Sequence, residues 1–259
     1  MRLSALFAAA VCALVAAPAL ASTCFQLAQG GPRAVPAALS LAPDEVGLRF
    51  LGHAAFRITT PQGISAVTDF SGFWGPGDPP DVATMNKAHI THWTPSPDPR
   101  IRHVLRGWNP DGGEAMHDLA VGDLIVRNVP TDIRSWDGGV EPLANSIFVF
   151  EAADLCIGHL GHLHHVPTEI QYGMIGRLDV VMAPVDGGYT MNLPAMISVL
   201  KRLRARVVIP MHWFGPANLE RFLAGMADDF AIRRVGAAEI AVSAARLPDR
   251  PTVMVLDGR

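Results

Sequence analysis

The chain has 259 residues, of which 49% are hydrophobic and 17% are charged, and its formal net charge at pH 7 is −3. This composition is that of a globular protein and excludes an intrinsically disordered chain. The slight negative charge provides no basic field of the kind that nucleic-acid binding requires, so no nucleic-acid partner is expected.

The N-terminus has the pattern of a secretory signal peptide. Met1-Arg2 is basic, residues 3–20 form an apolar run, and Ala19-Leu20-Ala21 has small residues where a signal peptidase reads them. A transmembrane anchor is the alternative, although the run is only marginally long enough to span a bilayer. We therefore predict a signal peptide over residues 1–21 and one mature domain over residues 22–259. The domain is expected to be periplasmic or secreted, with no membrane attachment after cleavage.

Two cysteines, Cys24 and Cys156, remain in the predicted mature chain. In an oxidising compartment they could form a disulfide. Alternatively, Cys156 is a buried free thiol that packs as a small hydrophobe within the apolar run Leu155-Cys156-Ile157. The sequence leaves both possibilities open, because pairing depends on the distance between the two Cα atoms.

Strands predominate in the first half of the predicted domain. Apolar or alternating runs predict strands at residues 46–50, 54–60, 64–70 and 82–85, the first three forming an antiparallel meander. Residues 94–118 contain turn formers without a clear period, so we expect a long loop there. Further strands are predicted at residues 124–129, 146–151 and 155–159.

Helices come late in the chain. The sequence predicts helices at residues 193–203 and 218–230, and strands at residues 178–182, 206–210, 240–243 and 253–256. Many strands with a few late helices indicate a layered α/β architecture in a single domain.

Seven of the ten histidines occupy three places, each at or just past the end of an apolar, strand-like run. They are His89 and His92, then His159, His162, His164 and His165, and finally His212. In layered α/β proteins the carboxyl ends of strands share an edge, and ligands bind there. Neutral imidazoles contributed by separate loops make a good tetrahedral site for Zn²⁺.

Individual histidines also have structural interpretations, since one at a strand end is more often hydrogen-bonded than metal-bound. We interpret His103 and His117 in that way. His159 could be a packing residue or could support a ligand, and His164 and His165 could form a polar loop. The strongest candidates for metal ligands are His89, His92, His162 and His212.

Three aspartates that follow apolar runs could take part in the chemistry: Asp69, Asp132 and Asp186. Each could act as a general base, a metal ligand, or a partner that orients an imidazole. Asp69 and Asp186 could equally cap turns. Beyond Asp186, Gly187-Gly188 would let backbone approach the pocket, and Tyr189 could donate a hydrogen bond there.

Several segments resemble the metallo-β-lactamase fold superfamily, within it the branch of L-ascorbate-6-phosphate lactonase-like hydrolases. They are, in order, residues 51–56, 68–69, 81–92, 158–163, 183–190 and 208–212. The resemblance extends from about residue 46 to about residue 225. It implies a four-layer αββα sandwich with one or two metal ions at the shared edge of its sheets.

The chain departs from the family's H-x-H-x-D-H signature, which falls on residues 87–92. Lys87 replaces the first histidine and Thr91 replaces the aspartate, while His162 stands where related sequences usually carry aspartate. Fewer ligands and an added ammonium favour one ion over two, because two divalent cations beside Lys87 would repel it strongly. Zinc fits best, and iron, manganese and nickel are alternatives. Lys87 itself is either a solvated lysine or an anchor for an anionic substrate or intermediate.

The resemblance implies hydrolysis by a metal-activated water of a small-molecule ester, lactone, amide or phosphoester. The candidate catalytic residues are Asp69, Lys87 and Asp186, and the altered signature argues against true β-lactam hydrolysis. An exported metal- or ligand-binding protein that has lost turnover is the alternative, and Thr91 in place of aspartate favours it. The oligomeric state is left open by the sequence.

Overall fold

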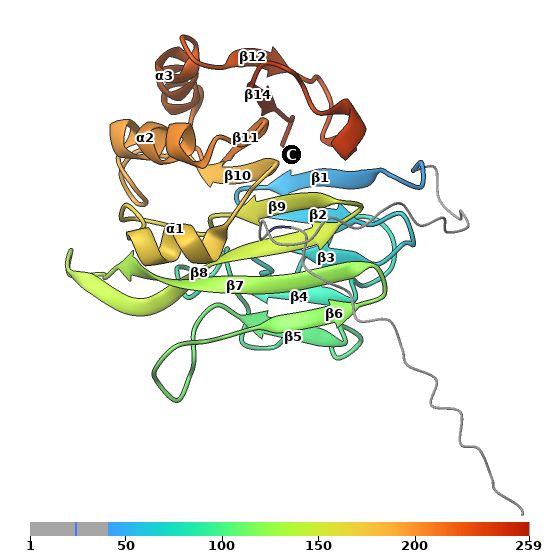
Figure 1. Cartoon of the computed structure of the whole chain (residues 1–259). Coiled ribbons are helices and arrows are strands. Elements are labelled where there is room, and N and C mark those ends of the chain that lie inside the picture. The colour runs from blue at the N-terminus through green and yellow to red at the C-terminus, as the bar shows by residue number, and fades with distance from the viewer. Residues whose placement is uncertain (1–23, 25–40, 259) are drawn as a thin grey trace, which may run out of the picture.

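The computed structural model describes Cys24 and residues 41–258. The signal peptide predicted over residues 1–21 lies outside these residues. Within them, the first five strands along the chain and the late strand β13 build a six-stranded sheet with the order β13-β1-β2-β3-β4-β5 (Figure 1). Its members are β1 (Val46–Gly52), β2 (Ala55–Thr59), β3 (Ser65–Val67), β4 (Val82–Met85), β5 (His103–Arg106) and β13 (Glu239–Val242).

The remaining strands form an eight-stranded sheet with the order β12-β14-β11-β10-β9-β8-β7-β6. Its central strands β9, β10 and β11 run parallel to one another, whereas β6 to β9 are antiparallel. Its members are β6 (Asp118–Val121), β7 (Leu124–Arg134), β8 (Val140–Ala152), β9 (Leu155–His159), β10 (Val180–Pro184), β11 (Val207–Met211), β12 (Ala231–Arg234) and β14 (Thr252–Val255).

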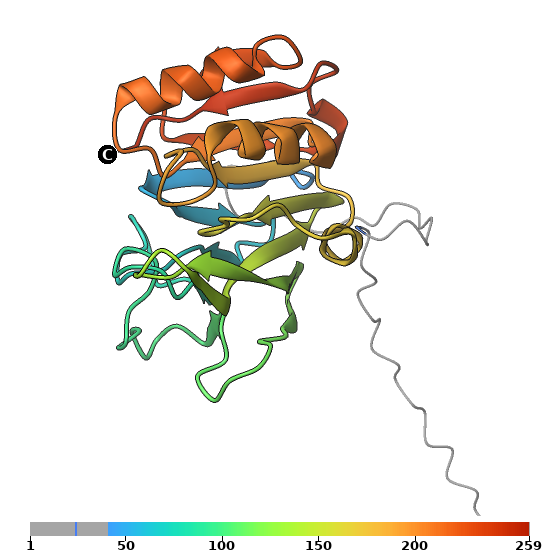
Figure 2. The same ribbon diagram turned by 90° about the vertical axis from the view of Figure 1, so that its left-hand side faces the viewer.

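The two sheets bury one apolar core between them, and the helices bury a second core against the eight-stranded sheet (Figure 2). Between the sheets, Phe56 of β2 and Phe148 of β8 are fully buried. Met196 and Phe222, from the helices, pack on the opposite face of the eight-stranded sheet. The helices are α1 (Glu169–Ile175), α2 (Leu193–Leu203), α3 (Pro216–Met226) and the short 3-10 turn η1 (Ala244–Arg246).

The α/β class with two packed sheets is therefore confirmed. The two sheets are covered differently on their outer faces. All three α-helices of the described residues contribute to the core on the eight-stranded sheet, and none of them covers the six-stranded sheet. On the six-stranded sheet a smaller apolar cluster contains Phe70, Met85 and Ile101, with Trp93 and Trp108 packed against it. Those two indoles contact each other at 5.7 Å between ring centroids and are partly buried against this cluster.

Most predicted elements are present, and the differences lie in short or exposed segments. The helix at 193–203 and the strands at 82–85 and 155–159 have the predicted bounds. The expectation of an uninterrupted loop over 94–118 was wrong, because β5 lies within it and pairs in parallel with β4. Helix α1 was also not predicted, although Thr168 and Gln171 form a capping box at its start.

Cys24 forms a disulfide with Cys156, a residue of β9 that lies 132 positions further along the chain. Both cysteines are buried in the core beneath the helices. The backbone carbonyl of Cys24 accepts a hydrogen bond from the Arg177 amide at 3.2 Å. Of the two states that the sequence left open for these cysteines, the structure has the paired one.

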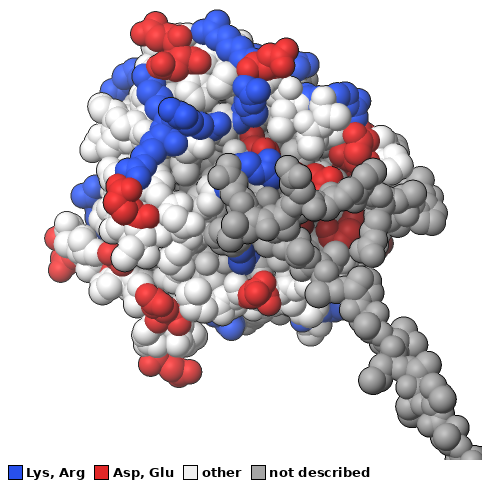
Figure 3. Space-filling model, in the orientation of Figure 1, with Lys and Arg blue, Asp and Glu red and all other residues white. Residues whose placement is uncertain are grey.

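The helical face of the molecule carries charges of both signs (Figure 3). Lys201 and Arg202 of α2 pair with Asp229 and Glu169 respectively, all of them on the surface. Such exposed pairs contribute little to stability. Among the described residues, none of the helices has the length and apolar character that crossing a membrane requires.

Candidate metal centre

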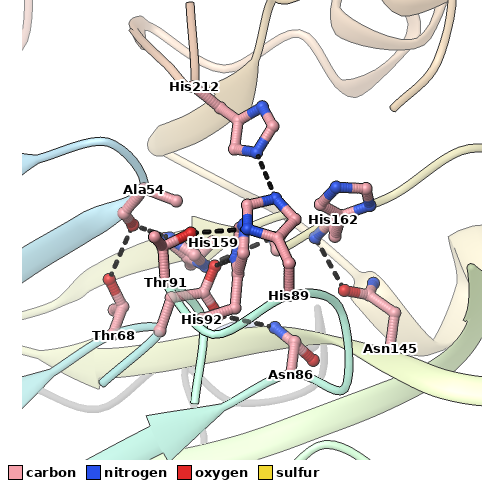
Figure 4. A network of polar contacts seen from close by, with 12 residues as sticks. Ala54, Thr68, Asn86, His89, Thr91, His92, Asn145, His159, His162 and His212 are labelled. Atoms are coloured by element: carbon pink, nitrogen blue, oxygen red, sulfur yellow. Dashed lines mark hydrogen bonds and ion pairs between the residues drawn. The ribbon is translucent and has the colours of Figure 1, made fainter. Parts of the chain in front are cut away.

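The candidate site lies where the carboxyl ends of parallel strands from both sheets meet. In the six-stranded sheet, β3 leads to Asp69, and β4 leads to the segment that carries His89 and His92. In the eight-stranded sheet, β9 and β11 lead to His162 and His212. The positions of these histidines after strands predict one shared edge, and the structure brings all four together there (Figure 4).

Five imidazole rings surround one small volume. Ligand atoms of His53, His89, His92 and His212 all lie within 4.8 Å of one another. The ring of His162 completes the group, with its centroid 5.1 Å from those of His92 and His212 and 5.4 Å from that of His89. No carboxylate of the described residues belongs to the inner group of ligand atoms.

The hydrogen bonding of these rings fits a metal ion. His53 Nε2, His92 Nε2 and both ring nitrogens of His162 are buried without a hydrogen-bond partner among the described residues. Buried polar atoms are normally satisfied, and an unpaired one costs on the order of 1–3 kcal/mol. His212 Nε2 and His89 Nε2 face each other at 3.4 Å. Two nitrogens on a tetrahedral zinc ion lie about 3.3 Å apart, so this spacing suits a shared cation.

Asp69 orients His92 from the side away from the cluster. The Nδ1–H group of His92 donates to Asp69 Oδ2 at 2.6 Å, and Asn86 Nδ2 donates to Asp69 Oδ1 at 2.9 Å. All three side chains are fully buried. Because Nδ1 holds the proton, Nε2 of His92 presents its lone pair to the cluster.

Asp186 performs the same task for His212, whose Nδ1–H group donates to Asp186 Oδ2 at 3.0 Å. The same carboxylate accepts from the hydroxyl of Thr190 and from the backbone amides of Gly188, Tyr189 and Thr190. One aspartate therefore fixes both a site imidazole and the loop over residues 187–190.

His162 is positioned through its backbone. Its amide donates to Asn145 Oδ1 at 2.7 Å, and the preceding Gly161 has φ +58°. A Cβ on Gly161 would lie 2.4 Å from both Asn145 Oδ1 and Asn86 Nδ2, so only glycine fits between these amides. His159 serves the fold instead, since its Nε2 lies 2.8 Å from the carbonyl oxygen of Ala54.

Thr91 and Lys87, the two departures from the family signature, occupy different surroundings. The hydroxyl of Thr91 lies 2.7 Å from Nδ1 of His89, so it contacts a site ring where the signature has aspartate. The ammonium of Lys87 is half-exposed and forms an ion pair with Glu141 at 2.5 Å. The structure thus leaves Lys87 paired at the surface, where its charge is already compensated.

Burial keeps three of the site imidazoles neutral, those of His53, His89 and His162. Burial, followed by the charges of His212, His92 and His89, lowers the pKa of His53 to about 3. Burial, followed by His92 and His212, lowers the pKa of His89 to about 4. For His162, burial and the same neighbouring rings lower the pKa to about 2. Neutral imidazole is the form that binds a metal.

The two carboxylates remain charged. Burial by itself would raise the pKa of Asp69, but the charges of His92 and His159 and the hydrogen bonds from His92 and Asn86 outweigh it and lower the pKa to about 2. Burial opposes ionisation of Asp186 as well, yet the hydrogen bonds from His212, Thr190 and the backbone hold its pKa far below the usual range. Each carboxylate would offset the positive charge of a metal ion held on the far side of its imidazole ring.

Three site residues have left-handed backbone conformations, which are uncommon for residues other than glycine. They are His53 at φ +54°, Asp69 at φ +43° and His212 at φ +55°. The amide of His212 donates to the carbonyl of His53 at 2.7 Å, which joins the two turns. Such strained positions concentrate at functional sites.

His53 is the member of the cluster that the sequence interpretation missed. It follows the apolar strand β1, so the criterion applied to the other histidines would have included it. His53 lies in the short turn between β1 and β2, and the sequence pattern there indicates a structural turn of an antiparallel meander. The carboxylate Asp132, by contrast, accepts from the Leu143 amide within the β7–β8 hairpin.

The fold and the arrangement of strand-end histidines define a class of metal-binding α/β proteins, and comparison with known proteins identifies the family. Residues 47–212 match the model of the beta-lactamase superfamily domain. The chain belongs to this superfamily.

Two relatives illustrate the similarity. A protein from Thermotoga maritima, assigned as a Zn-dependent hydrolase of the metallo-β-lactamase superfamily, is 26% identical with a TM-score of 0.58, covering 83% of this chain and 100% of that one. A UPF0173 metal-dependent hydrolase from Ignicoccus hospitalis is 32% identical over 110 residues, which are 41% of this chain and 44% of that protein. The match thus spans less than half of the Ignicoccus protein.

A third similarity shows how widely the fold is used. CmlA, a diiron β-hydroxylase from Streptomyces venezuelae, has a TM-score of 0.51 at 12% identity, over 78% of this chain and 55% of that one. At this identity the similarity concerns the fold alone. The reaction must therefore be argued from the site and not from the fold.

Proposed function

We propose that this protein is an exported, metal-dependent hydrolase that acts on a small-molecule ester, lactone, amide or phosphoester. The observation that carries the proposal is the convergence of five imidazoles, several of them with unpartnered buried nitrogens, on one volume. The names of the Thermotoga and Ignicoccus relatives support hydrolysis.

We assign His92 and His212 as metal ligands first, because each has a buried carboxylate on Nδ1 and directs Nε2 into the cluster. His89 joins them, since its Nε2 lies 3.4 Å from that of His212. His162 or His53 supplies a fourth nitrogen, and the ring that does not bind the ion remains beside it as a neutral hydrogen-bond donor. Asp69 and Asp186 thereby act as orienting residues in this proposal.

A bound divalent ion, for which zinc is the first candidate, lowers the pKa of water and polarises a carbonyl or phosphoryl oxygen. The residues of the chain orient the ligand rings and stabilise the charge that develops on the substrate. Asp69 and Asp186 keep the proton of their imidazole on Nδ1 and fix the ring. The neutral ring left beside the ion can donate a hydrogen bond to the oxyanion that develops on the substrate.

We propose one ion. The inner group consists of imidazoles with no bridging carboxylate among the described residues, and a two-metal site needs ligands for ions about 3.5–4 Å apart. Repulsion by Lys87 is not a reason for the single ion, because Glu141 pairs with the ammonium and compensates its charge.

Export is part of the proposal. The signal-peptide pattern at residues 1–21 supports it, and so does the buried disulfide between Cys24 and Cys156, since disulfides persist in oxidising compartments. We expect a small-molecule substrate and no nucleic-acid partner.

The test separates metal binding from turnover. His53, His89, His92, His162 and His212 are each changed to alanine, and bound metal is measured by mass spectrometry alongside hydrolysis of a panel of lactones, p-nitrophenyl esters and phosphodiesters. We expect the His92→Ala and His212→Ala proteins to lose both metal and turnover. His103→Ala is the control, because His103 lies on β5 outside the ring cluster.

Stoichiometric metal without turnover on any member of the panel would favour the alternative, an exported metal-binding protein on the same fold. Wild-type protein that purifies without metal, and takes up none when zinc is added, would overturn the proposal.

A further inference from the structure

Two exposed aromatic side chains lie against the metal centre. The rings of Tyr189 and Phe214 contact each other edge to face, with centroids 5.2 Å apart. Phe214 also contacts the cluster itself, at 5.1 Å from the ring of His212 and 5.7 Å from that of His53. The aromatic pair is therefore continuous with the imidazole group.

Both rings are open to solvent, with 66% of Tyr189 and 57% of Phe214 exposed. Other aromatic residues near the site are buried or partly buried in cores: Trp213, for example, packs on Phe50 with ring centroids 5.5 Å apart. Scattered exposed apolar residues are ordinary, whereas a contacting pair beside a metal centre forms a surface that a ligand can cover.

The pair is held by the same groups that build the metal centre. The Tyr189 amide donates to Asp186 Oδ1, and Asp186 also orients His212. Phe214 follows His212 by two residues, after its left-handed turn. Asn218 Nδ2 of α3 donates to the Asp186 carbonyl at 2.8 Å and ties the two loops together. The backbone that carries the two rings is thus held in place before any ligand arrives, which reduces the entropy lost on binding.

We propose that Tyr189 and Phe214 form a subsite for the apolar group attached to the scissile carbonyl of the substrate. The inference rests on the proposed function, because the metal centre fixes where that carbonyl lies. It narrows the substrate class to esters, lactones or amides with an alkyl or aryl acyl portion. The two rings offer apolar faces and no cation that could pair with a phosphate, so they favour an alkyl or aryl acyl portion over an anionic one.

The experiment measures binding separately from catalysis. Unbranched alkyl hydroxamic acids, from acetohydroxamic to octanohydroxamic acid, are titrated into zinc-loaded protein by calorimetry. In wild type we expect affinity to rise about two- to fourfold for each added methylene. In Phe214→Ala and Tyr189→Ala, we expect the ratio of octanoyl to acetyl affinity to fall about tenfold.

Two further variants serve as controls for disturbance of the site and for the loss of an exposed apolar side chain elsewhere. Phe214→Leu keeps apolar area and should restore most of the chain-length dependence, even if truncation to alanine disturbs the neighbouring His212. Ile170→Ala removes a side chain of similar exposure on α1 and should leave the dependence as in wild type. Metal content is measured for each variant.

Hydrolysis of p-nitrophenyl esters of the same chain lengths separates the two proposals. In one outcome, binding depends on chain length, the alanine variants lose this dependence, and no ester is hydrolysed. That result would support the subsite and contradict the proposed hydrolase activity. Turnover with no chain-length dependence in wild type, or with the same dependence in the alanine variants, would overturn the subsite alone. Protein that binds neither zinc nor hydroxamates would overturn both.

Discussion

Asp69 shows how a buried charge can orient a candidate ligand ring from outside the histidine cluster. Its two oxygens are used by His92 and Asn86, on the far side of the imidazole from the cluster. The ring of His92 thus lies between the Asp69 carboxylate and the volume that a metal ion would occupy. This arrangement fixes the tautomer and raises the basicity of the ligand nitrogen.

The Asp69→Asn substitution should weaken metal binding about 10- to 100-fold. An amide has only one acceptor oxygen, so it cannot accept from both His92 and Asn86 as the carboxylate does. The measurement is competition with a zinc chelator. Asp98→Asn is the control, because Asp98 forms an exposed pair with Arg100. An affinity within twofold of wild type would contradict the orienting role.

The lowered pKa values of His53, His89 and His162 make the metal-free protein sensitive to acid. Burial lowers the pKa of His162 from 6.5 to about 2, so between these values the unfolded chain binds a proton that the native protein does not. Stability is unaffected above pH 6.5 and falls as the pH drops below it. Near pH 5.5, a fully buried neutral histidine costs about 1.4 kcal/mol.

Urea unfolding in EDTA at pH 7.5 and pH 5.5 checks this expectation. The difference in unfolding free energy between the two pH values should shrink by about 1.4 kcal/mol in His162→Gln. An unchanged difference would show that His162 does not resist protonation in the native state.

At the scale of elements, the short turns after the strands decide the geometry of the site. Gly161 separates β9 from His162, and its φ of +58° brings its backbone against Asn86 and Asn145. Those two amides hold Asp69 and the His162 backbone. The turn is therefore tied to both sides of the cluster.

The Gly161→Ala substitution should lower the free energy of unfolding by roughly 1–3 kcal/mol and weaken metal binding. Gly173→Ala, in the middle of α1, is the matched control, because nothing lies within 4 Å of its added Cβ. The control should gain about 0.5–1 kcal/mol. Thermal and urea unfolding measure both, and equal effects at the two glycines would contradict the account.

The elements that could be predicted are those with local signals. Val82–Met85 and Leu155–His159 are apolar and fully buried, and Leu193–Leu203 has both a capping asparagine and a buried face. Strand β5, by contrast, is four half-buried residues whose conformation comes from pairing with β4. Strand β12 is mostly exposed, and its pairing with β14 has no periodic signature in the sequence.

At the scale of the whole molecule, the disulfide connects the N-terminal end of the predicted mature domain to the strand that leads to the site. Cys156 lies three residues before His159 on β9. Closing a chain separation of 132 residues removes conformational freedom from the unfolded state, so the bond should stabilise the native one.

The Cys24→Ser substitution should lower the free energy of unfolding by about 2–5 kcal/mol, measured by urea unfolding without reductant. Cys156→Ser and the double variant should show similar losses, because all three lack the same bond. Additive losses would mean that each cysteine acts through packing alone. Thiol titration of the mature protein should detect no free thiol before reduction.

The sequence by itself determined most of the strands and the placement of histidines at their ends, since both follow from local patterning and from the geometry of parallel strands. It also indicated His89, His92, His162 and His212 as one group, although their roles as ligands remain predictions. It could not determine what each side chain contacts.

Only the tertiary structure decided that His53 joins the cluster, that Glu141 pairs with Lys87, and that Asp69 and Asp186 bind imidazoles. It also brought Tyr189 beside Phe214. These contacts join residues distant in the chain through backbone turns with positive φ and through packing of one sheet on the other. Neither leaves a periodic trace in the sequence, because each depends on the position of a partner that folding supplies.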